Sequence, residues 1–177
     1  MLDNLETSES ALDSVAGAYS AEAIDTSAQP KTFVTFGISG QTFGVEVSFV
    51  REILDHIEIA RVPNTRPEIN GIIDIRNESV PIMDIGSQLG MHHLETGTET
   101  RIIIFEIRTD DEARPIGILA DRVRDVTQIP ATEIEAPPEA IGGIGNGSVL
   151  SGLARHDDLL IALLDIETIL SSNSGYY

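Results

Sequence analysis

Cysteine is absent from the 177 residues, so the chain can form no disulfide bond, no thiolate metal site and no cysteine nucleophile. Long apolar runs are missing too, because no stretch approaches the roughly 20 apolar residues that a membrane-spanning helix needs. The N-terminus has no basic segment followed by an apolar run, which argues against a secretory signal. Together these absences favour a cytoplasmic protein.

Positive charge is scarce. Lys31 is the only lysine, and the formal net charge is −18 at pH 7. A surface this acidic repels phosphate backbones, which argues against nucleic-acid binding. Two explanations of the charge stay open. One is adaptation to high salt, where screening weakens the repulsion within the compact state. The other is an ordinary acidic cytoplasmic protein.

The two ends of the chain differ from its middle. Residues 1–30 carry acidic side chains but no basic one, and Ser, Thr and Ala fill much of the remainder. The segment can bury little apolar area, which is too little to offset the conformational entropy that its backbone would lose on ordering. We therefore predict a disordered acidic tail that is dispensable for folding. Residues 172–177 are expected to form a frayed C-terminus. The folded domain is therefore expected over residues 31–171.

Short segments rich in strand-forming residues fill the predicted domain, and turn residues separate them. The expected strands are 33–38, 43–47, 71–76, 80–85, 101–108, 116–120 and 159–164. Residues 77–79 are expected to connect a hairpin. Helical periodicity occurs only at 47–54 and 166–170. Many short strands with frequent turns predict an all-β barrel or sandwich.

An internal repeat is the strongest organisational signal. Residues 44–53 align without gaps on residues 117–126, at an offset of 73. Residues 71–85 align on residues 152–166, at an offset of 81. A period of this length is too long for a solenoid unit. It indicates two copies of one small β subdomain.

Catalytic motifs find little support. The glycine-rich residues 142–147 do not follow a strand and open a helix, as a phosphate-binding loop would. His92 and His93, with Glu95, could suggest a metal site, but adjacent side chains on an extended chain point to opposite faces. We therefore assign no catalytic residue, metal ligand or cofactor. The alternative function is a small β-barrel hydrolase that uses scattered carboxylates or a metal at His92 and His93.

Three polar residues in predicted strands are more informative. Asp84 and Asp165 close apolar strands at equivalent repeat positions, and each is expected to cap the short helix that follows. Arg76 lies where a strand meets a turn. It is either a solvated hairpin arginine or an exposed planar fork for a carboxylate of a partner. The residues alone leave both interpretations open.

These residues belong to a larger pattern. The pattern comprises Phe43-Gly44-Val45-Glu46-Val47, Val50-Arg51-Glu52-Ile53, Arg61 through Gly71, Asp74-Ile75-Arg76-Asn77 with Pro81 and Asp84, Gly117 through Val126, and Gly152 through Leu170. It resembles the CheW family of chemotaxis coupling proteins in order over about residues 32–171. Two departures stand beside Arg76, where Asn77 replaces the family glycine and Asp74 replaces the usual asparagine. Asp74 is therefore expected to pair with Arg76 and to weaken its availability.

The resemblance implies a non-enzymatic adaptor with no cofactor. Its fold would be two five-stranded, SH3-like β-barrels with short helices, the first at about 32–91 and the second at about 100–170. Its partners would be the regulatory domain of the histidine kinase CheA and the cytoplasmic tips of methyl-accepting chemotaxis receptors. The adaptor would be cytoplasmic, without inserting into the membrane, and would join receptor arrays at the inner membrane. The partner-binding residues implied are Val50, Glu52, Arg76 and Asp84.

Overall fold

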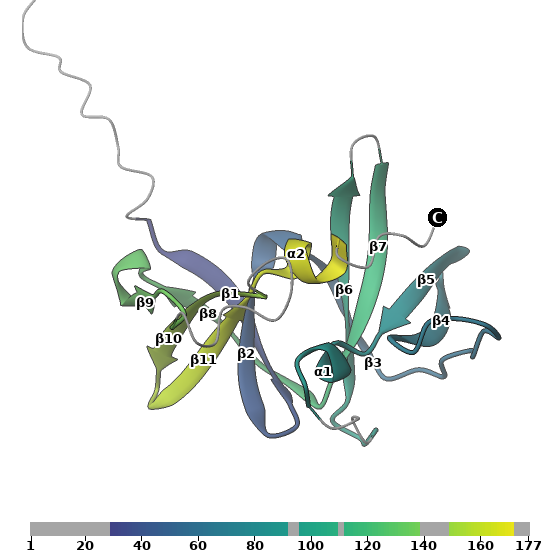
Figure 1. Cartoon of the computed structure of the whole chain (residues 1–177), viewed down its shortest axis with the longest axis horizontal. Coiled ribbons are helices and arrows are strands. Elements are labelled where there is room, and N and C mark those ends of the chain that lie inside the picture. The colour runs from purple at the N-terminus through teal and green to yellow at the C-terminus, as the bar shows by residue number, and fades with distance from the viewer. Residues whose placement is uncertain (1–28, 92–95, 110–111, 139–148, 172–177) are drawn as a thin grey trace, which may run out of the picture.

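The computed structural model describes residues 29–91, 96–109, 112–138 and 149–171, shown in colour in Figure 1. Its elements, in chain order, are β1 (Lys31–Ile38), β2 (Gln41–Glu46), the 3-10 helix η2 (Val47–Phe49), β3 (Val50–Asp55), β4 (Ile69–Ile75), β5 (Glu78–Met83), α1 (Ile85–Gln88), β6 (Arg101–Thr109), β7 (Glu112–Ala120), β8 (Arg122–Ile129), the 3-10 helix η3 (Ala131–Glu133), β9 (Ile134–Glu135), β10 (Leu150–His156), β11 (Leu159–Leu164) and α2 (Ile166–Ser171). The predicted all-β class is confirmed, with few and short helices.

The strands form two sheets that lie side by side (Figure 1). The six-stranded sheet has the order β8-β1-β2-β11-β10-β9, and the five-stranded sheet has the order β3-β6-β7-β5-β4. Within the described residues no strand pairing joins the first strand of either order to the last. Each sheet is therefore curled and open rather than a closed barrel.

The division of the chain into consecutive barrels needs a correction. Strands β1 and β2 of the first half join β8 to β11 of the second half, whereas β6 and β7 join β3, β4 and β5. Each sheet thus combines strands from both halves. A repeat in sequence cannot show this, because equivalent strands of the two copies offer the same edges and faces to a neighbour. The exchange buries both faces of β1, where Phe33 and Val34 are 2% and 1% exposed.

The exchanged strands obey the sequence repeat. Gly44 in β2 lies opposite Leu163 in β11, and Gly117 in β7 lies opposite Ile82 in β5. In the repeat, Gly44 corresponds to Gly117 and Ile82 corresponds to Leu163, so each glycine lies opposite an apolar residue of the other copy. A Cβ atom on Gly44 would lie 2.9 Å from Leu163 Cδ2, and one on Gly117 would lie 2.4 Å from Ile82 Cδ1. The two glycines are therefore needed where a side chain from the parallel neighbour crosses the backbone.

The main apolar core lies between the sheets. It includes Val34, Phe36 and Phe43 from β1 and β2, together with buried residues of β4 to β7 and of α2. A second, smaller cluster lies under the six-stranded sheet and contains Phe33, Ile129, Ala154, Ile161 and Leu163. Burial of both clusters stabilises the pair of sheets by removing apolar surface from water.

Several local predictions are confirmed and two are wrong. The strand at 159–164 has the predicted bounds, and α2 occupies the second helical segment. The segment 47–54 is not a helix, because only η2 is helical and β3 follows, held by its pairing with β6. The hairpin turn is formed by residues 76–77 rather than 77–79. The tail through residue 28, the histidines of 92–93 and residues 172–177 lie outside the described residues.

Candidate partner-binding site

The turn between β4 and β5 is tight and carries an arginine. Ile75 pairs with Glu78, which leaves Arg76 and Asn77 as a two-residue connection. Their φ angles are 52° and 66°, as a type I′ turn requires. Such turns favour Asn-Gly, and a left-handed conformation costs an ordinary side chain about 1–2 kcal/mol. Arg76 therefore adopts a backbone conformation that costs more for an arginine than for Gly or Asn.

Asp74 stabilises this turn. Its Oδ1 accepts a hydrogen bond from the backbone N–H of Asn77 at 3.1 Å, as turn-forming Asp residues do. The prediction that Asp74 forms an ion pair with Arg76 is wrong, because the Arg76 guanidinium pairs with Glu52 on β3 instead. Asn77 tolerates the left-handed conformation, so the turn survives the loss of the family glycine.

Four charged residues lie together at this tip, and we call them the charged array: Arg51, Glu52, Arg76 and Glu78. Arg76 Nη2 lies 3.3 Å from Glu52 Oε2, and Arg51 Nη1 lies 2.8 Å from Glu78 Oε2. Arg51 Nε is 3.9 Å from Glu52 Oε1. The array links β3, at one end of the sheet order, with the β4–β5 hairpin at the other end. Ion pairs therefore bridge the two ends of the sheet order on its open side.

Exposure differs within the charged array. The side chain of Arg76 is 77% exposed, whereas that of Glu52 is only 19% exposed. Exposed ion pairs contribute about 0–1 kcal/mol to stability, because water screens them and ordering long side chains is costly. The Arg76–Glu52 pair therefore orients an available guanidinium more than it stabilises the fold. A guanidinium has further donors that a carboxylate of a partner can accept.

The other two predicted partner-binding residues lie in different environments. Val50 is half-buried, pairs with Phe105 and packs against the main core. Asp84 is buried at 8% exposure, and its Oδ1 accepts a hydrogen bond from the Ser87 N–H at 3.3 Å. Asp165 receives the Thr168 N–H in the same way at 2.9 Å. Both aspartates therefore cap the helices that follow them, as expected.

Exposed apolar side chains lie in β3 and in the 3-10 helix before it. Val47 and Ile53 are 41% and 38% exposed, and both belong to the segment that carries the array. Beyond β3, a shallow hollow of about 750 Å³ is lined by residues that include His56, Arg61 and Leu119. Apolar side chains beside a charged rim are typical of a protein–protein interface.

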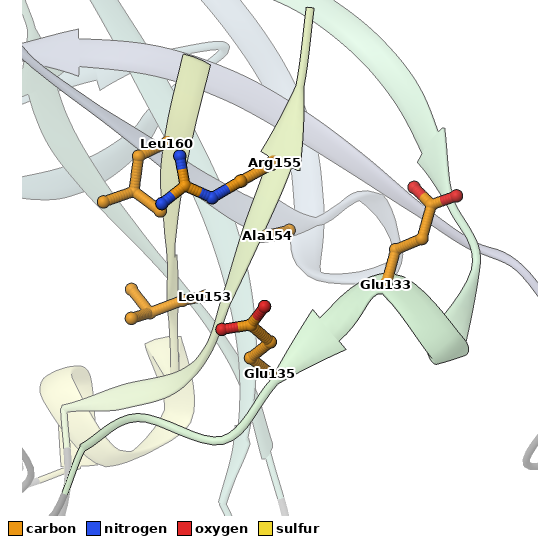
Figure 2. Close-up of a pocket in the computed structure, with 6 residues that line it drawn as sticks. All are labelled: Glu133, Glu135, Leu153, Ala154, Arg155 and Leu160. Carbon is orange, nitrogen blue, oxygen red and sulfur yellow. The ribbon is translucent and has the colours of Figure 1, made fainter. Parts of the chain in front are cut away.

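A second hollow lies on the six-stranded sheet (Figure 2). It measures about 340 Å³ and is lined by Glu133, Glu135, Leu153, Ala154, Arg155 and Leu160. Figure 2 shows the Arg155 guanidinium beside Leu160, with the two carboxylates on the side of η3 and β9. An open apolar floor with charges at its margin fits a contact surface better than a catalytic cleft.

Within residues 29–91, 96–109, 112–138 and 149–171, no group of three or more His, Asp or Glu residues is arranged to hold a metal ion. The Nε2 atom of His156 forms a hydrogen bond with Thr127 Oγ1 at 2.9 Å. No described helix has the length and apolarity needed to cross a bilayer.

Comparison with known proteins decides the family. The model of the CheW-like domain matches residues 32–174. The chain belongs to the CheW-like domain family. The chemotaxis protein CheW of Bacillus subtilis is 27% identical over 142 residues, covering 80% of this chain and 88% of that protein. CheW of Klebsiella aerogenes is 28% identical over 140 residues, covering 79% and 81%.

Solved structures agree with this assignment. The crystal structure of the scaffolding protein TtCheW from Thermoanaerobacter tengcongensis superposes with a TM-score of 0.68 at 26% identity. It covers 80% of this chain and 88% of the TtCheW chain. The chain is thus a CheW-type chemotaxis adaptor and not an enzyme. The family assignment, rather than any missing motif, removes the small hydrolase as the preferred function.

Proposed function

We propose that this adaptor couples methyl-accepting chemotaxis receptors to the histidine kinase CheA. The kinase contact uses the charged hairpin tip, with Arg76 as the central residue and Glu52 as the group that orients it. The main support for this proposal is the geometry of Arg76. It adopts a left-handed turn conformation, its Nη2 lies 3.3 Å from Glu52 Oε2, and its side chain is still 77% exposed. Arginine is enriched among the residues that dominate interface energies.

The receptor contact would use Val50 and the exposed apolar residues beside it. Val47 and Ile53 offer the apolar surface that an amphipathic helix of a receptor tip can bury. We leave Asp84 out of both surfaces, because its carboxylate is buried against α1. An adaptor of this kind works in the cytoplasm, associated with receptor arrays at the inner membrane.

Arg76→Ala tests this proposal. We expect affinity for the CheA regulatory domain to fall about thirtyfold, which corresponds to roughly 2 kcal/mol. The free energy of unfolding should change by less than about 0.5 kcal/mol, because the side chain is exposed. Isothermal titration calorimetry gives the first quantity, and denaturant unfolding gives the second.

A matched control separates this site from a general loss of positive charge. Arg114 also forms an exposed ion pair, with Nη2 3.1 Å from Glu112 Oε2, but it lies within a regular strand of the β6–β7 hairpin. Arg114→Ala should leave kinase affinity within about twofold of wild type. Equal losses in both variants would contradict a specific role for Arg76. Binding of a receptor cytoplasmic fragment, measured in parallel, shows whether the two contacts are separable.

A further inference from the structure

The charged array has an order. Its members alternate in sign along the contacts, from Arg76 to Glu52, then to Arg51, then to Glu78. The two inner members, Glu52 and Arg51, are 19% and 30% exposed in their side chains. The two outer members, Arg76 and Glu78, are 77% and 41% exposed. The surface therefore presents one positive end and one negative end to a partner.

A β-bulge creates this arrangement. Consecutive side chains of a regular strand point to opposite faces, so Arg51 and Glu52 could not both reach one hairpin from an ideal β3. The pairing of β3 with β6 shifts register between Val50 and Glu52, which leaves Arg51 as the extra residue. Bulges re-aim side chains in this way. As a result both residues contact charges of the β4–β5 hairpin.

The second half has the same bulge, but the positions equivalent to the charged array do not form one. Its pairing of β8 with β1 also shifts register, and the extra residue there is Arg124, followed by Asp125. The positions equivalent to Arg76 and Glu78 are Asp157 and Leu159. Neither can continue an alternating chain of charges from Asp125. The bulge is thus a property of the duplicated fold, whereas the array is specific to the first half.

We propose that Glu78 determines partner specificity and that Arg51 is its positioning residue. Glu78 selects a basic side chain on the same CheA surface that offers a carboxylate to Arg76. Arg51 holds the carboxylate of Glu78 from one side and that of Glu52 from the other. This inference rests on the proposed kinase contact and adds to it the charge pattern that the kinase surface must carry. Complementary charges of this kind discriminate between partners more than they raise affinity.

Glu78→Gln and Glu78→Lys test the specificity role, with the CheA regulatory domain as the probe. We expect affinity to fall about fivefold for the glutamine variant, and further for lysine, which repels a basic group. The differences should shrink as salt rises, because the Debye length falls from about 10 Å at 0.1 M to about 3 Å at 1 M. Glu112→Gln, which removes the carboxylate of another exposed ion pair, is the matched control and should stay within about twofold of wild type.

The outcomes separate the two proposals. If Arg76→Ala weakens binding but both Glu78 variants bind like the Glu112→Gln control, the specificity role of Glu78 is wrong and the kinase contact stands. If wild-type protein does not bind the regulatory domain at all, the proposed function is wrong, and this inference fails with it.

Arg51 requires a double-mutant cycle. If Arg51 acts through Glu78, Arg51→Gln should weaken binding, and adding it to Glu78→Gln should cause little further loss. Arg51→Lys, which keeps the charge, should recover part of the affinity. Thermal midpoints should differ little, since the Arg51–Glu78 pair is partly exposed and such surface pairs contribute little to stability. Additive losses would mean that Arg51 acts independently of Glu78, either by contacting the kinase directly or through Glu52. Unchanged binding would mean that Arg51 has no role, and either result contradicts its positioning of Glu78.

Discussion

The β4–β5 and β10–β11 hairpins have the same backbone and opposite charges. In the first, Arg76 and Asn77 have φ angles of 52° and 66°; in the second, Asp157 and Asp158 have φ angles of 48° and 62°. Both are two-residue connections between paired strands. The duplication therefore preserved a turn and not the side chains at its tip. In the proposed kinase contact, partner recognition depends on those side chains, whereas the fold supplies only their position.

The two hairpins also contact their neighbouring strands through different interactions. The first is joined to β3 by the ion pairs of the charged array. The second is joined to β8 by His156, whose Nε2 lies 2.9 Å from Thr127 Oγ1. Beside it, Asp157 Oδ2 lies 3.6 Å from the same nitrogen. Equivalent parts of the sheets are thus connected by a charged link in one half and a hydrogen bond in the other.

The largest expected difference between the halves concerns Gly71 and Gly152. Gly71 has φ 147°, and a Cβ atom there would lie 2.3 Å from Ala60 O. Gly152 lies at the equivalent position, where a Cβ atom would lie 2.6 Å from the side-chain atom Ile134 Cγ2 and 3.2 Å from the backbone Glu135 O. Gly71→Ala should lower the free energy of unfolding by more than about 3 kcal/mol, and Gly152→Ala by about 1–2 kcal/mol. Denaturant unfolding measures both, and equal losses would remove this distinction.

The next effect is on binding. Arg76→Ala should weaken the CheA contact by roughly 2 kcal/mol, whereas Asp157→Ala should change it by less than about 0.4 kcal/mol. The reason is that, of the two tips, the first carries an exposed guanidinium, that of Arg76, which the ion pair with Glu52 orients. Titration of both variants against the same regulatory domain tests the comparison. A comparable loss for Asp157→Ala would show that both tips contact the kinase.

The helix caps should behave alike. Asp84→Ala and Asp165→Ala each remove a carboxylate that accepts a backbone N–H in the first turn of a short helix. Each should lower the free energy of unfolding by about 1 kcal/mol. A loss of kinase or receptor binding in Asp84→Ala, at unchanged stability, would instead return Asp84 to the partner-binding residues.

The smallest effect concerns the strained turns. Asn77→Gly and Asp158→Gly place glycine where φ is positive, which should raise the free energy of unfolding by about 0.5 kcal/mol in each half. Similar thermal shifts in both variants would confirm that the two turns are equivalent. A loss confined to Asn77→Gly would show that its side chain has a role that the turn geometry does not explain.

Much of the fold could be read from local patterns. The strand at 159–164, the caps Asp84 and Asp165 and the repeat itself depend on residue type and spacing, which the sequence states directly. The segment 47–54 has a helical period in its sequence but forms η2 and the bulged strand β3. The exposure of Arg76 was anticipated from its place beside a turn. Its pairing with Glu52 was not, because 24 positions separate the two residues in the chain.

Residue types and their spacing specify the all-β class, the duplicated unit and the family pattern over most of the chain, and they place Arg76 beside a hairpin turn. The tertiary structure decided which copy each strand joins and which charges meet at the hairpin tip. The physical reason is the same for both. Equivalent strands offer identical hydrogen-bonding edges, so only packing of the whole molecule selects between them, as the Gly44–Leu163 and Gly117–Ile82 contacts show. Arg51 likewise meets Glu78 because a bulge and a curled sheet bring distant residues together.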